Sequence, residues 1–251
     1  MNHPEKTDTI RDRLARLRSE LEPVGTLVET VVPLPRSGAR YRIMHPADID
    51  PLIDAVADDP EQNLPYWAEL WPSGIALADA IALRPQTVAG FRVLEIGCGL
   101  GVTAIAALNA GADLTVTDYA PESLLLARAN CLANAGREPS TLQMNWRKPP
   151  DELFDLAGEG FPVVLAADVL YESRDVQPLL GLLGRLVAPG GLLWLAEPRR
   201  PVAARFIEIA CAQDWELSES DGEWDGPWPD PNDAGVHVRV HRLRRVPSPG
   251  S

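Results

Sequence analysis

The sequence predicts an α/β fold with a doubly wound, mostly parallel seven-stranded sheet of the Rossmann-like kind. From Phe91 onward, short apolar runs alternate with helical stretches, which is typical of a parallel sheet with helices on both faces. The runs VVLAA (163–167) and LLWLA (192–196) show no polar alternation, as expected for strands buried on both faces. A glycine-rich turn, residues 97–101, directly follows the first expected strand, residues 92–96. In sheets of this kind, ligands bind at the carboxyl ends of the strands.

Residues 1–65 are expected to form an extension, a helix and a β-hairpin packed on the domain. Residues 7–22 place apolar side chains at helical spacing, with arginines mostly on the other faces. Such a basic amphipathic helix either binds a membrane surface or partner, or packs its single apolar stripe on the domain. Residues 26–32 and 39–44 are β-rich and flank a Pro/Gly loop, which predicts the hairpin.

Residues 66–246 are expected to form the main domain. Ser73 is a candidate N-cap for a helix that ends near Leu83, before Pro85. The strands expected in the domain are 92–96, 114–117, 141–144, 162–167 and 191–196, and the helices are 101–110, 121–135, 175–187 and 201–213. The last runs, 215–220 and 236–244, flank a Gly/Pro/Asp loop and predict a closing antiparallel pair at the sheet edge. Residues 247–251 are expected to be a loose tail.

The composition excludes several functional classes. A formal charge of −13 over 251 residues disfavours a general nucleic-acid binder and adsorption to anionic lipid. Three cysteines, without a CxxC pair or a Cys/His cluster, argue against a disulfide framework and against a zinc site. The N-terminus lacks the apolar core of a signal peptide, and no run is long enough to span a bilayer. We therefore expect a soluble cytoplasmic protein without a metal.

The glycine turn distinguishes between two classes of nucleotide-like ligand. Its sequence, Glu95-Ile-Gly97-Cys98-Gly99-Leu-Gly101, has GxGxG spacing instead of the GxGxxG of dinucleotide sites. Asp118 ends the next strand, at a spacing typical of a carboxylate that binds ribose hydroxyls. Glu95 would repel a pyrophosphate but not a cationic ligand. The pattern favours S-adenosylmethionine, which has a sulfonium, an amine and a ribose diol but no phosphate.

These motifs resemble those of the seven-β-strand (class I) methyltransferases, over about residues 24–245. The resemblance rests on 93-VLEIGCGLG-101 and 115-TVTD-118. Three further motifs, 66-YWAELWPSG-74, 144-MNW-146 and 167-ADVLYE-172, are similar to those of the protein-lysine methyltransferase family that includes the methyltransferase of the electron-transfer flavoprotein β subunit. The hairpin that leads into YWAELWP strengthens this likeness.

The resemblance implies S-adenosylmethionine as cofactor, S-adenosylhomocysteine as product, and a set of pocket residues. The implied cofactor-binding residues are Trp71, Gly97, Cys98, Gly99, Asp118, Trp146 and Ala167. The chain departs from the family at Asn145, where many members carry an acid. We keep Asn145 in the predicted site because an amide both donates to and accepts from adenine. Glu95 joins the set because it lies at the carboxyl end of the strand.

The predicted reaction is methyl transfer to a lysine of a protein substrate. The lysine must lose its proton, and desolvation beside aromatic walls lowers its pKa. Asp168 and Tyr171 are the candidate catalytic residues, because 168-DVLY-171 begins where the fourth strand ends. The competing interpretation is that Asp168 only caps the next helix. Trp67, Trp224 and Trp228 are the candidate substrate residues.

Two other functions stay open at this stage. The same cofactor pocket would serve a small-molecule N- or O-methyltransferase, since fold does not fix substrate. A catalytically silent module that binds the cofactor or a partner is the alternative from another class. The sequence does not indicate the oligomeric state, the identity of the acceptor or the number of methyl groups added.

Overall fold

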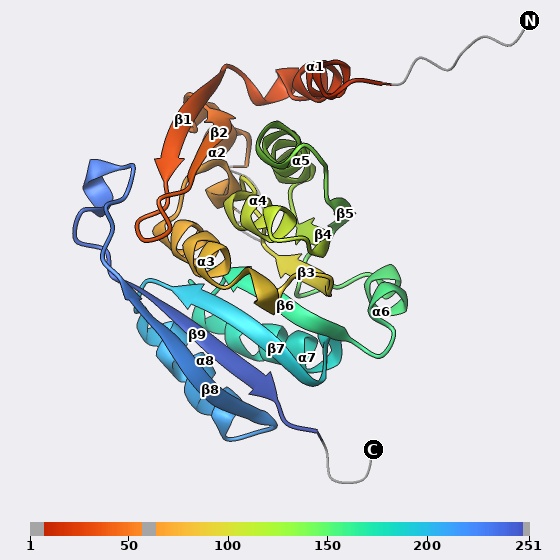
Figure 1. The fold of residues 1–251 in the computed structure, drawn as a ribbon, viewed down its shortest axis with the longest axis vertical. Coiled ribbons are helices and arrows are strands. Elements are labelled where there is room, and N and C mark those ends of the chain that lie inside the picture. Colours follow the sequence, from red (N-terminus) through yellow and green to blue (C-terminus); the bar gives the residue numbers. More distant parts are fainter. Residues whose placement is uncertain (1–7, 57–63, 248–251) are drawn as a thin grey trace, which may run out of the picture.

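The structure, a computed structural model, describes residues 8–56 and 64–247 (Figure 1). The strands are β1 (Leu27–Pro33), β2 (Arg40–Pro46), β3 (Arg92–Ile96), β4 (Asp113–Asp118), β5 (Ser140–Gln143), β6 (Phe161–Ala167), β7 (Val187–Glu197), β8 (Trp215–Trp224) and β9 (Val238–Arg245). The α-helices are α1 (Ile10–Glu20), α2 (Asp50–Ala55), α3 (Pro72–Leu83), α4 (Val102–Asn109), α5 (Pro121–Ala135), α6 (Asp151–Ala157), α7 (Val176–Leu186) and α8 (Pro201–Cys211). Five 3₁₀ turns are Glu22–Val24, Tyr66–Ala68, Pro85–Thr87, Ser173–Asp175 and Pro231–Asp233.

The central sheet has seven strands in the order β5-β4-β3-β6-β7-β9-β8, which confirms the predicted fold class. The pairings from β5 to β7 are parallel, and β9 runs antiparallel between β7 and β8. The strand order reverses between β3 and β6. The carboxyl ends of β3, β4 and β6 therefore converge on the switch point where ligands bind in such sheets.

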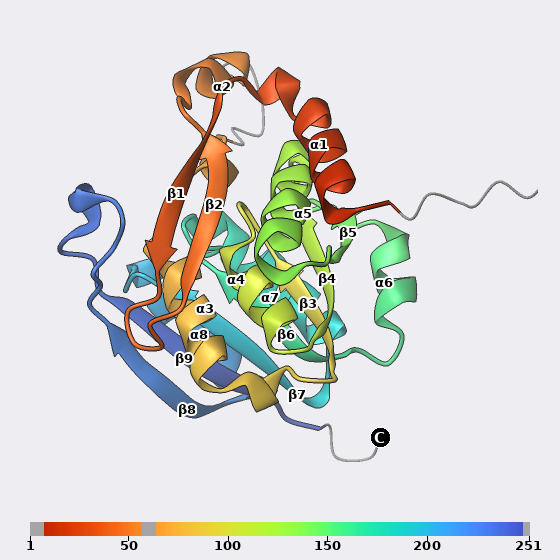
Figure 2. The ribbon, with the colours of Figure 1, turned by 45° about the horizontal axis from the view of Figure 1, so that its top comes forward.

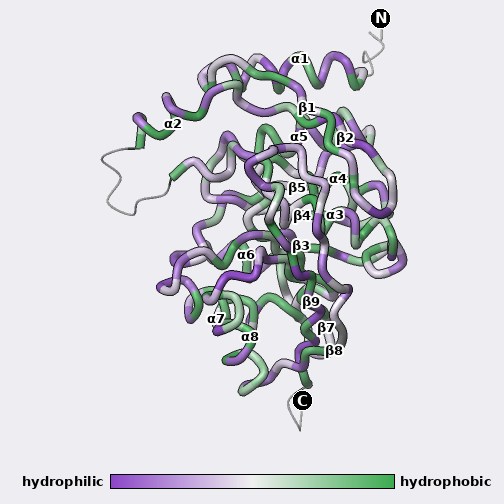
Figure 3. The backbone as a smooth tube through the Cα atoms, turned by 90° about the vertical axis from the view of Figure 1, so that its left-hand side faces the viewer, coloured by the Kyte–Doolittle hydropathy of each residue, from purple (hydrophilic) through white to green (hydrophobic). Residues whose placement is uncertain are grey.

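Two apolar layers cover the sheet, one on each face. One layer joins α3, α4 and α5 to side chains such as Val93 and Trp194, and the other joins α6, α7 and α8 to side chains such as Leu94 and Leu193. Adjacent residues of one strand contribute to opposite layers because side chains alternate along a strand. Hydrophobic colouring follows the inner strands, whereas α1 alternates between the two colours (Figure 3).

The N-terminal extension packs on the domain, as one of the two interpretations of its amphipathic helix predicts. Helix α1 lies beside α5, and the β1–β2 hairpin covers the same side of the molecule (Figure 2). Leu17 is buried there, and Arg13 and Arg128 both pair with Glu138. Asn130 of α5 bonds the backbone of Met44 in β2.

The structure corrects some details of the prediction. Helix α3 begins at Pro72, with Trp71 as N-cap residue and no side-chain cap, so Ser73 is not a cap. The predicted C-terminal pair forms, but β9 inserts next to β7 and leaves β8 at the edge. Helices α2 and α6 were not expected; both are short, with six and seven residues. Most of the predicted tail (residues 248–251) lies outside the described residues.

Candidate functional site

The glycine turn lies at the carboxyl end of β3, next to β4. The N–H groups of Gly97 and Cys98 both donate to the carbonyl of Thr117, at 2.9 and 3.0 Å. Gly97 has φ +68°, and a Cβ there would lie 3.1 Å from Cγ1 of Val169. At Gly101 a Cβ would lie 2.9 Å from Cα of Ala127. Gly97 therefore keeps the pocket side of the turn open, while Gly101 allows α4 and α5 to pack closely.

Asp118, at the end of β4, holds this turn in place. Its Oδ2 accepts from the N–H of Gly99 at 3.0 Å, and its Oδ1 accepts from the N–H of Ala120 at 3.2 Å. Burial raises the pKa of Asp118, an effect that the bond from Gly99 partly offsets. The carboxylate is 5% exposed and lines the pocket.

Glu95 is a buried acid in β3, two residues before Gly97. Its side chain is 2% exposed, and its Oε2 has no hydrogen-bond partner among the described residues. Burial, and secondarily the charge of Asp118, raises the pKa of Glu95 well above its ordinary range. A buried carboxyl oxygen without a donor is costly, so this position is poised to accept from a donor or a cation.

A pocket at the switch point brings most of the predicted residues together. It contains Trp67, Trp71, Gly97, Gly99, Asp118, Trp146, Ala167, Asp168 and Tyr171, together with Tyr66, Tyr119 and Val169. Its lining has two carboxylates and no basic side chain. The enclosed space is narrow, about 70 Å³, and opens beside Tyr66 and Tyr171 into a wider recess of about 310 Å³.

Asp168 forms a polar cluster at the mouth of this pocket. Ser73 Oγ donates to Oδ2 of Asp168 at 3.1 Å, and Arg200 pairs with its Oδ1. Burial raises the pKa of Asp168, and the Arg200 guanidinium partly counters that rise. The side chain caps no helix: Glu172 and Asp175 precede the next two helical segments, and neither segment has a side-chain cap. The capping interpretation of Asp168 is therefore wrong.

Aromatic rings line one side of the mouth. The ring of Tyr171 packs edge-on against Tyr66 at 5.5 Å and against Trp146 at 6.3 Å, and Tyr66 packs against Trp71 at 6.0 Å. Trp71 Nε1 donates to the carbonyl of Tyr66 at 2.7 Å. Burial raises the pKa of Tyr171, so its phenol stays protonated at neutral pH.

Three predicted cofactor residues, Glu95, Cys98 and Asn145, do not line the pocket. Cys98 is buried, and its Sγ lies 3.7 Å from Ser123 Oγ. Burial raises the pKa of this thiol well above its usual value, so the group is a neutral filler, not a nucleophile. Asn145 lies in an adjoining small recess with Trp146, and its Oδ1 accepts from the N–H of Arg147 at 2.9 Å.

Two predicted substrate residues, Trp224 and Trp228, do not line the pocket. Trp224 is 1% exposed, its Nε1 donates to Oδ2 of Asp79 at 2.9 Å, and Arg36 stacks on its ring. Trp228 is 9% exposed and donates to the carbonyl of Val236. Both anchor the loop after β8, so their assignment to substrate is wrong. The loop itself does reach the site: Asp233 and His237 line a recess with Trp71, Asp168 and Arg200.

Sequence reasoning missed four residues around the site. Tyr66, Tyr119, Ser73 and Arg200 line the pocket or bond Asp168. Tyr119 and Arg200 follow the carboxyl ends of β4 and β7, so their positions in the chain could have indicated them. Tyr66 and Ser73 precede the sheet and follow no strand end, but both lie within the motif 66-YWAELWPSG-74, which could have indicated them.

The donors and acceptors of the pocket fit a cationic, ribose-bearing ligand. Gly97 and Gly99 leave room for a ligand backbone, and Asp118 offers a carboxylate near the turn. Glu95 does not line the pocket, but its buried Oε2 has no hydrogen-bond partner among the described residues. The lining lacks the basic groups that a phosphate would require. Within residues 8–56 and 64–247, no cluster of His, Cys, Asp and Glu has the arrangement of a metal site.

Comparisons with known proteins point the same way. The family model described as "Methyltransferase domain" matches residues 94–193. The electron transfer flavoprotein beta subunit lysine methyltransferase of Xenopus laevis is 45% identical over 132 residues, which cover 51% of this chain and 49% of that protein. The ubiquinone biosynthesis O-methyltransferase of Azorhizobium caulinodans is 31% identical over 135 residues, 54% of this chain and 50% of that protein. The chain thus spans about half the length of these relatives.

The fold also matches solved structures. The N-methyltransferase NodS of Bradyrhizobium japonicum, in complex with S-adenosyl-L-homocysteine, superposes with a TM-score of 0.53 at 18% identity, and the match covers 78% of this chain and 99% of NodS. TrmN of Thermus thermophilus gives a TM-score of 0.52 at 20% identity, covering 69% of this chain and 49% of TrmN. No helix in the described ranges has the length and apolar character needed to cross a membrane.

Proposed function

Since the chain carries a class I methyltransferase domain similar to that of the electron transfer flavoprotein beta subunit lysine methyltransferases, we propose that it transfers a methyl group from S-adenosylmethionine to a protein lysine. The observation that carries the proposal is the pocket at the switch point. It combines an open glycine turn, Asp118 and Asp168, and it has no basic side chain in its lining. These features suit a sulfonium cofactor and an incoming ammonium.

The cofactor would be held by the glycine turn, Asp118, Glu95 and the ring of Trp146. It supplies, when bound, an activated methyl group on a cationic sulfur. Asp118 would exchange its bond to the Gly99 N–H for ribose hydroxyls, or share its second lone pair with them. Glu95 would accept from the amino-acid end of the ligand and so gain the donor that it lacks here.

The lysine would enter past Tyr66 and Tyr171. Their rings would attract the ammonium through cation–π contact and exclude water from it. The loss of water around the ammonium lowers the lysine pKa.

Asp168 would orient the amine and take part in its deprotonation. Ser73 and Arg200 hold the two carboxylate oxygens from opposite sides, so the group is positioned before substrate arrives. Because burial raises the pKa of Asp168, its carboxylate is a better proton acceptor than an exposed aspartate. Arg200 must give up part of its contact as the ammonium reaches Oδ1.

A small-molecule O-methyltransferase is the second candidate, favoured by the similarity to the ubiquinone biosynthesis enzymes. The deciding experiment incubates the purified protein with methyl-labelled S-adenosylmethionine and cell lysate, with Asp168→Asn as the matched control of lowered activity. The proposal expects label on protein bands that is recovered as methyllysine after hydrolysis. Label on small solutes would favour the second candidate, and no incorporation would favour a silent binding module.

A further inference from the structure

A second hollow lies at the opposite end of the sheet from the methyl-transfer site. It occupies about 500 Å³, within the range of small-ligand sites. Its strand residues come from the start of β6, the first half of β7 and the last half of the antiparallel β9. It is therefore at the amino ends of the parallel strands, while Asp118 and Asp168 are at their carboxyl ends. Nothing in the proposed methyl transfer uses it.

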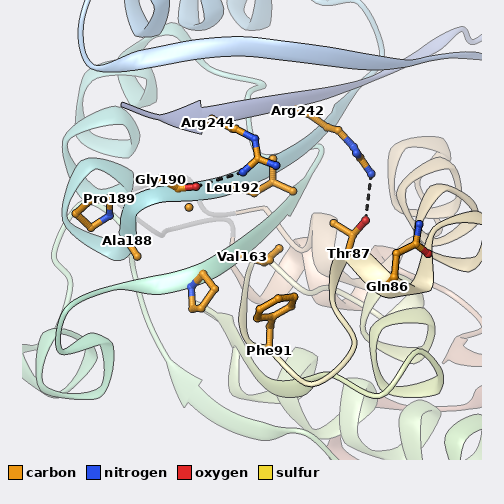
Figure 4. A pocket seen from close by; sticks show the side chains of 12 residues that line it. Gln86, Thr87, Phe91, Val163, Ala188, Pro189, Gly190, Leu192, Arg242 and Arg244 are labelled. Atoms are coloured by element: carbon orange, nitrogen blue, oxygen red, sulfur yellow. Dashed lines mark hydrogen bonds between the residues drawn. The ribbon is translucent and has the colours of Figure 1, made fainter. Parts of the chain in front are cut away.

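The floor and one wall of this amino-end pocket are apolar. Val163 and Leu192 form the buried floor, at 4% and 5% exposure. The ring of Phe91, 45% exposed, lies beside Val163 and faces the hollow (Figure 4). An aromatic ring left this open at the edge of a preformed hollow offers a surface on which a planar apolar group can stack.

The opposite wall is cationic. Arg242 and Arg244 are two residues apart on β9 and extend toward the same side (Figure 4). The twelve lining residues include these two arginines and no acid, in a chain with a net charge of −13. Gln86 and Thr87 add polar groups at the rim. The lining thus combines an apolar stacking face with donors suited to an anion.

Arg242 is fixed in place by its neighbours. Its Nε donates to Oδ2 of Asp221 at 3.0 Å, its Nη2 donates to Thr87 Oγ1 at 3.2 Å, and its guanidinium lies over the ring of Trp194. Asp221 also pairs with Arg84, so one buried carboxylate serves two arginines.

Arg244 is the more available cation. Its one bond within the described chain is from Nη1 to the carbonyl of Gly190, at 3.3 Å, and it forms no ion pair there. Glu216 stands across from it on β8, and that side chain is exposed. The remaining N–H groups of Arg244 are therefore free to bind a carboxylate, which guanidinium groups bind with two parallel hydrogen bonds.

We propose that this amino-end pocket binds a small aromatic carboxylic acid, its ring against Phe91 and its carboxylate on Arg244, beside Arg242. The probe for the test is benzoate, and benzamide is the neutral ligand of the same shape. Titration is followed by amide chemical shifts in the full chain. We expect benzoate to shift the amide signals of residues 86–91, 188 and 190–192. Benzamide should bind at least about tenfold more weakly, because it lacks the charge that strengthens a hydrogen bond to a guanidinium.

Arg244→Gln and Arg245→Gln form the matched pair of variants. Both remove one positive charge from adjacent positions of β9, but Arg245 points to the other face of the sheet and lies outside the lining. Arg244→Gln should weaken benzoate at least about tenfold, whereas Arg245→Gln should leave its affinity within about twofold. Phe91→Ala should weaken benzoate severalfold while the protein stays folded.

Three results would overturn the proposal. Benzamide could bind as tightly as benzoate, Arg244→Gln could bind as tightly as the unaltered chain, or the shifts could lie outside the pocket. None depends on methyl transfer, so a failure of the proposed function leaves this test intact.

Discussion

The two ends of the sheet hold charge in opposite ways. At the carboxyl end, Glu95 and Asp118 are buried and Asp168 is partly buried, and burial raises the pKa of all three carboxyl groups. At the amino end, Arg84 and Arg242 both pair with one buried acid, Asp221, while the exposed Arg244 bonds the carbonyl of Gly190 and forms no ion pair within the described residues. Burial thus disfavours the charged form of the three acids at the carboxyl end, whereas the amino end presents the cation of Arg244 to solvent.

Backbone strain separates the two ends further. Asp168 (φ 57°) and Arg199 (φ 60°) are the non-glycine residues with left-handed backbone in the described ranges, and both lie at the carboxyl end. Conformations of this kind cost of the order of 1–3 kcal/mol and persist where the surroundings enforce them. The carboxyl end therefore carries both electrostatic and conformational cost, which is the pattern expected of a reactive site. The predictions below test that contrast.

The largest expected effect is at Gly97. Gly97→Val would place a branched side chain against Val169 and Trp146, in the space of the ligand's amino-acid end. We expect S-adenosylmethionine affinity, measured by calorimetry, to fall by more than about 100-fold, which corresponds to about 2.7 kcal/mol. The valine side chain would clash with the ligand and displace it from its contacts with the turn. Gly111→Val is the control: it has the same left-handed backbone (φ +92°) and no atom within 4 Å of its Cβ. Equal loss of affinity in both variants would assign the effect to backbone strain.

Asp168 should affect turnover and not cofactor affinity. Asp168→Asn keeps the volume, and asparagine tolerates the left-handed backbone, so the fold should survive. Turnover should fall by roughly tenfold or more, as for lost acid–base help, with cofactor affinity changed by less than about threefold. Tyr171→Phe should lower turnover in the same direction. Normal turnover in Asp168→Asn would contradict the catalytic assignment. Loss of cofactor binding would instead assign Asp168 to the cofactor site.

Asp118 should affect the binding of the cofactor. Asp118→Ala removes a carboxylate that would bind ribose hydroxyls, and charge-assisted bonds are worth roughly 1.5–3 kcal/mol each. We expect at least a tenfold loss of S-adenosylmethionine affinity by calorimetry. The same change removes acceptors for Gly99 and Ala120, so the melting temperature should also fall. Unchanged affinity in a folded variant would show that the ribose site is elsewhere.

The sequence predicts well whatever depends on local spacing. The glycine turn, Asp118 and Trp146 each follow a strand end, and strand ends can be located from the apolar runs. The contacts of Asp168 could not be predicted in this way, because its partners Ser73 and Arg200 lie 95 and 32 residues away in the chain, and only the fold brings them to the carboxylate. Trp224 failed for the same reason: its partner Asp79 is 145 residues away, and only packing brings the two together.

The smallest effect, and the most direct test of the contrast, is on stability at Glu95. Because the folded-state pKa of Glu95 is raised, its contribution to stability is fully present below the unfolded pKa of about 4.3 and is lost as pH rises through the higher folded value. Glu95→Gln keeps the shape without the charge. Its melting temperature should match that of the unaltered chain at pH 4 and exceed it by about 2–4 °C at pH 8, the shift that 1 kcal/mol gives at this size.

The same variant should bind S-adenosylmethionine more weakly, because the negative charge that would attract the cationic ligand is gone. Scanning calorimetry at the two pH values, together with binding at pH 8, measures both effects on one protein. A variant that is more stable and binds less tightly would show that the carboxyl end trades stability for function. If Glu95→Gln is less stable at pH 8, the buried carboxylate is compensated in the folded chain, and the two ends of the sheet do not differ in the way described above.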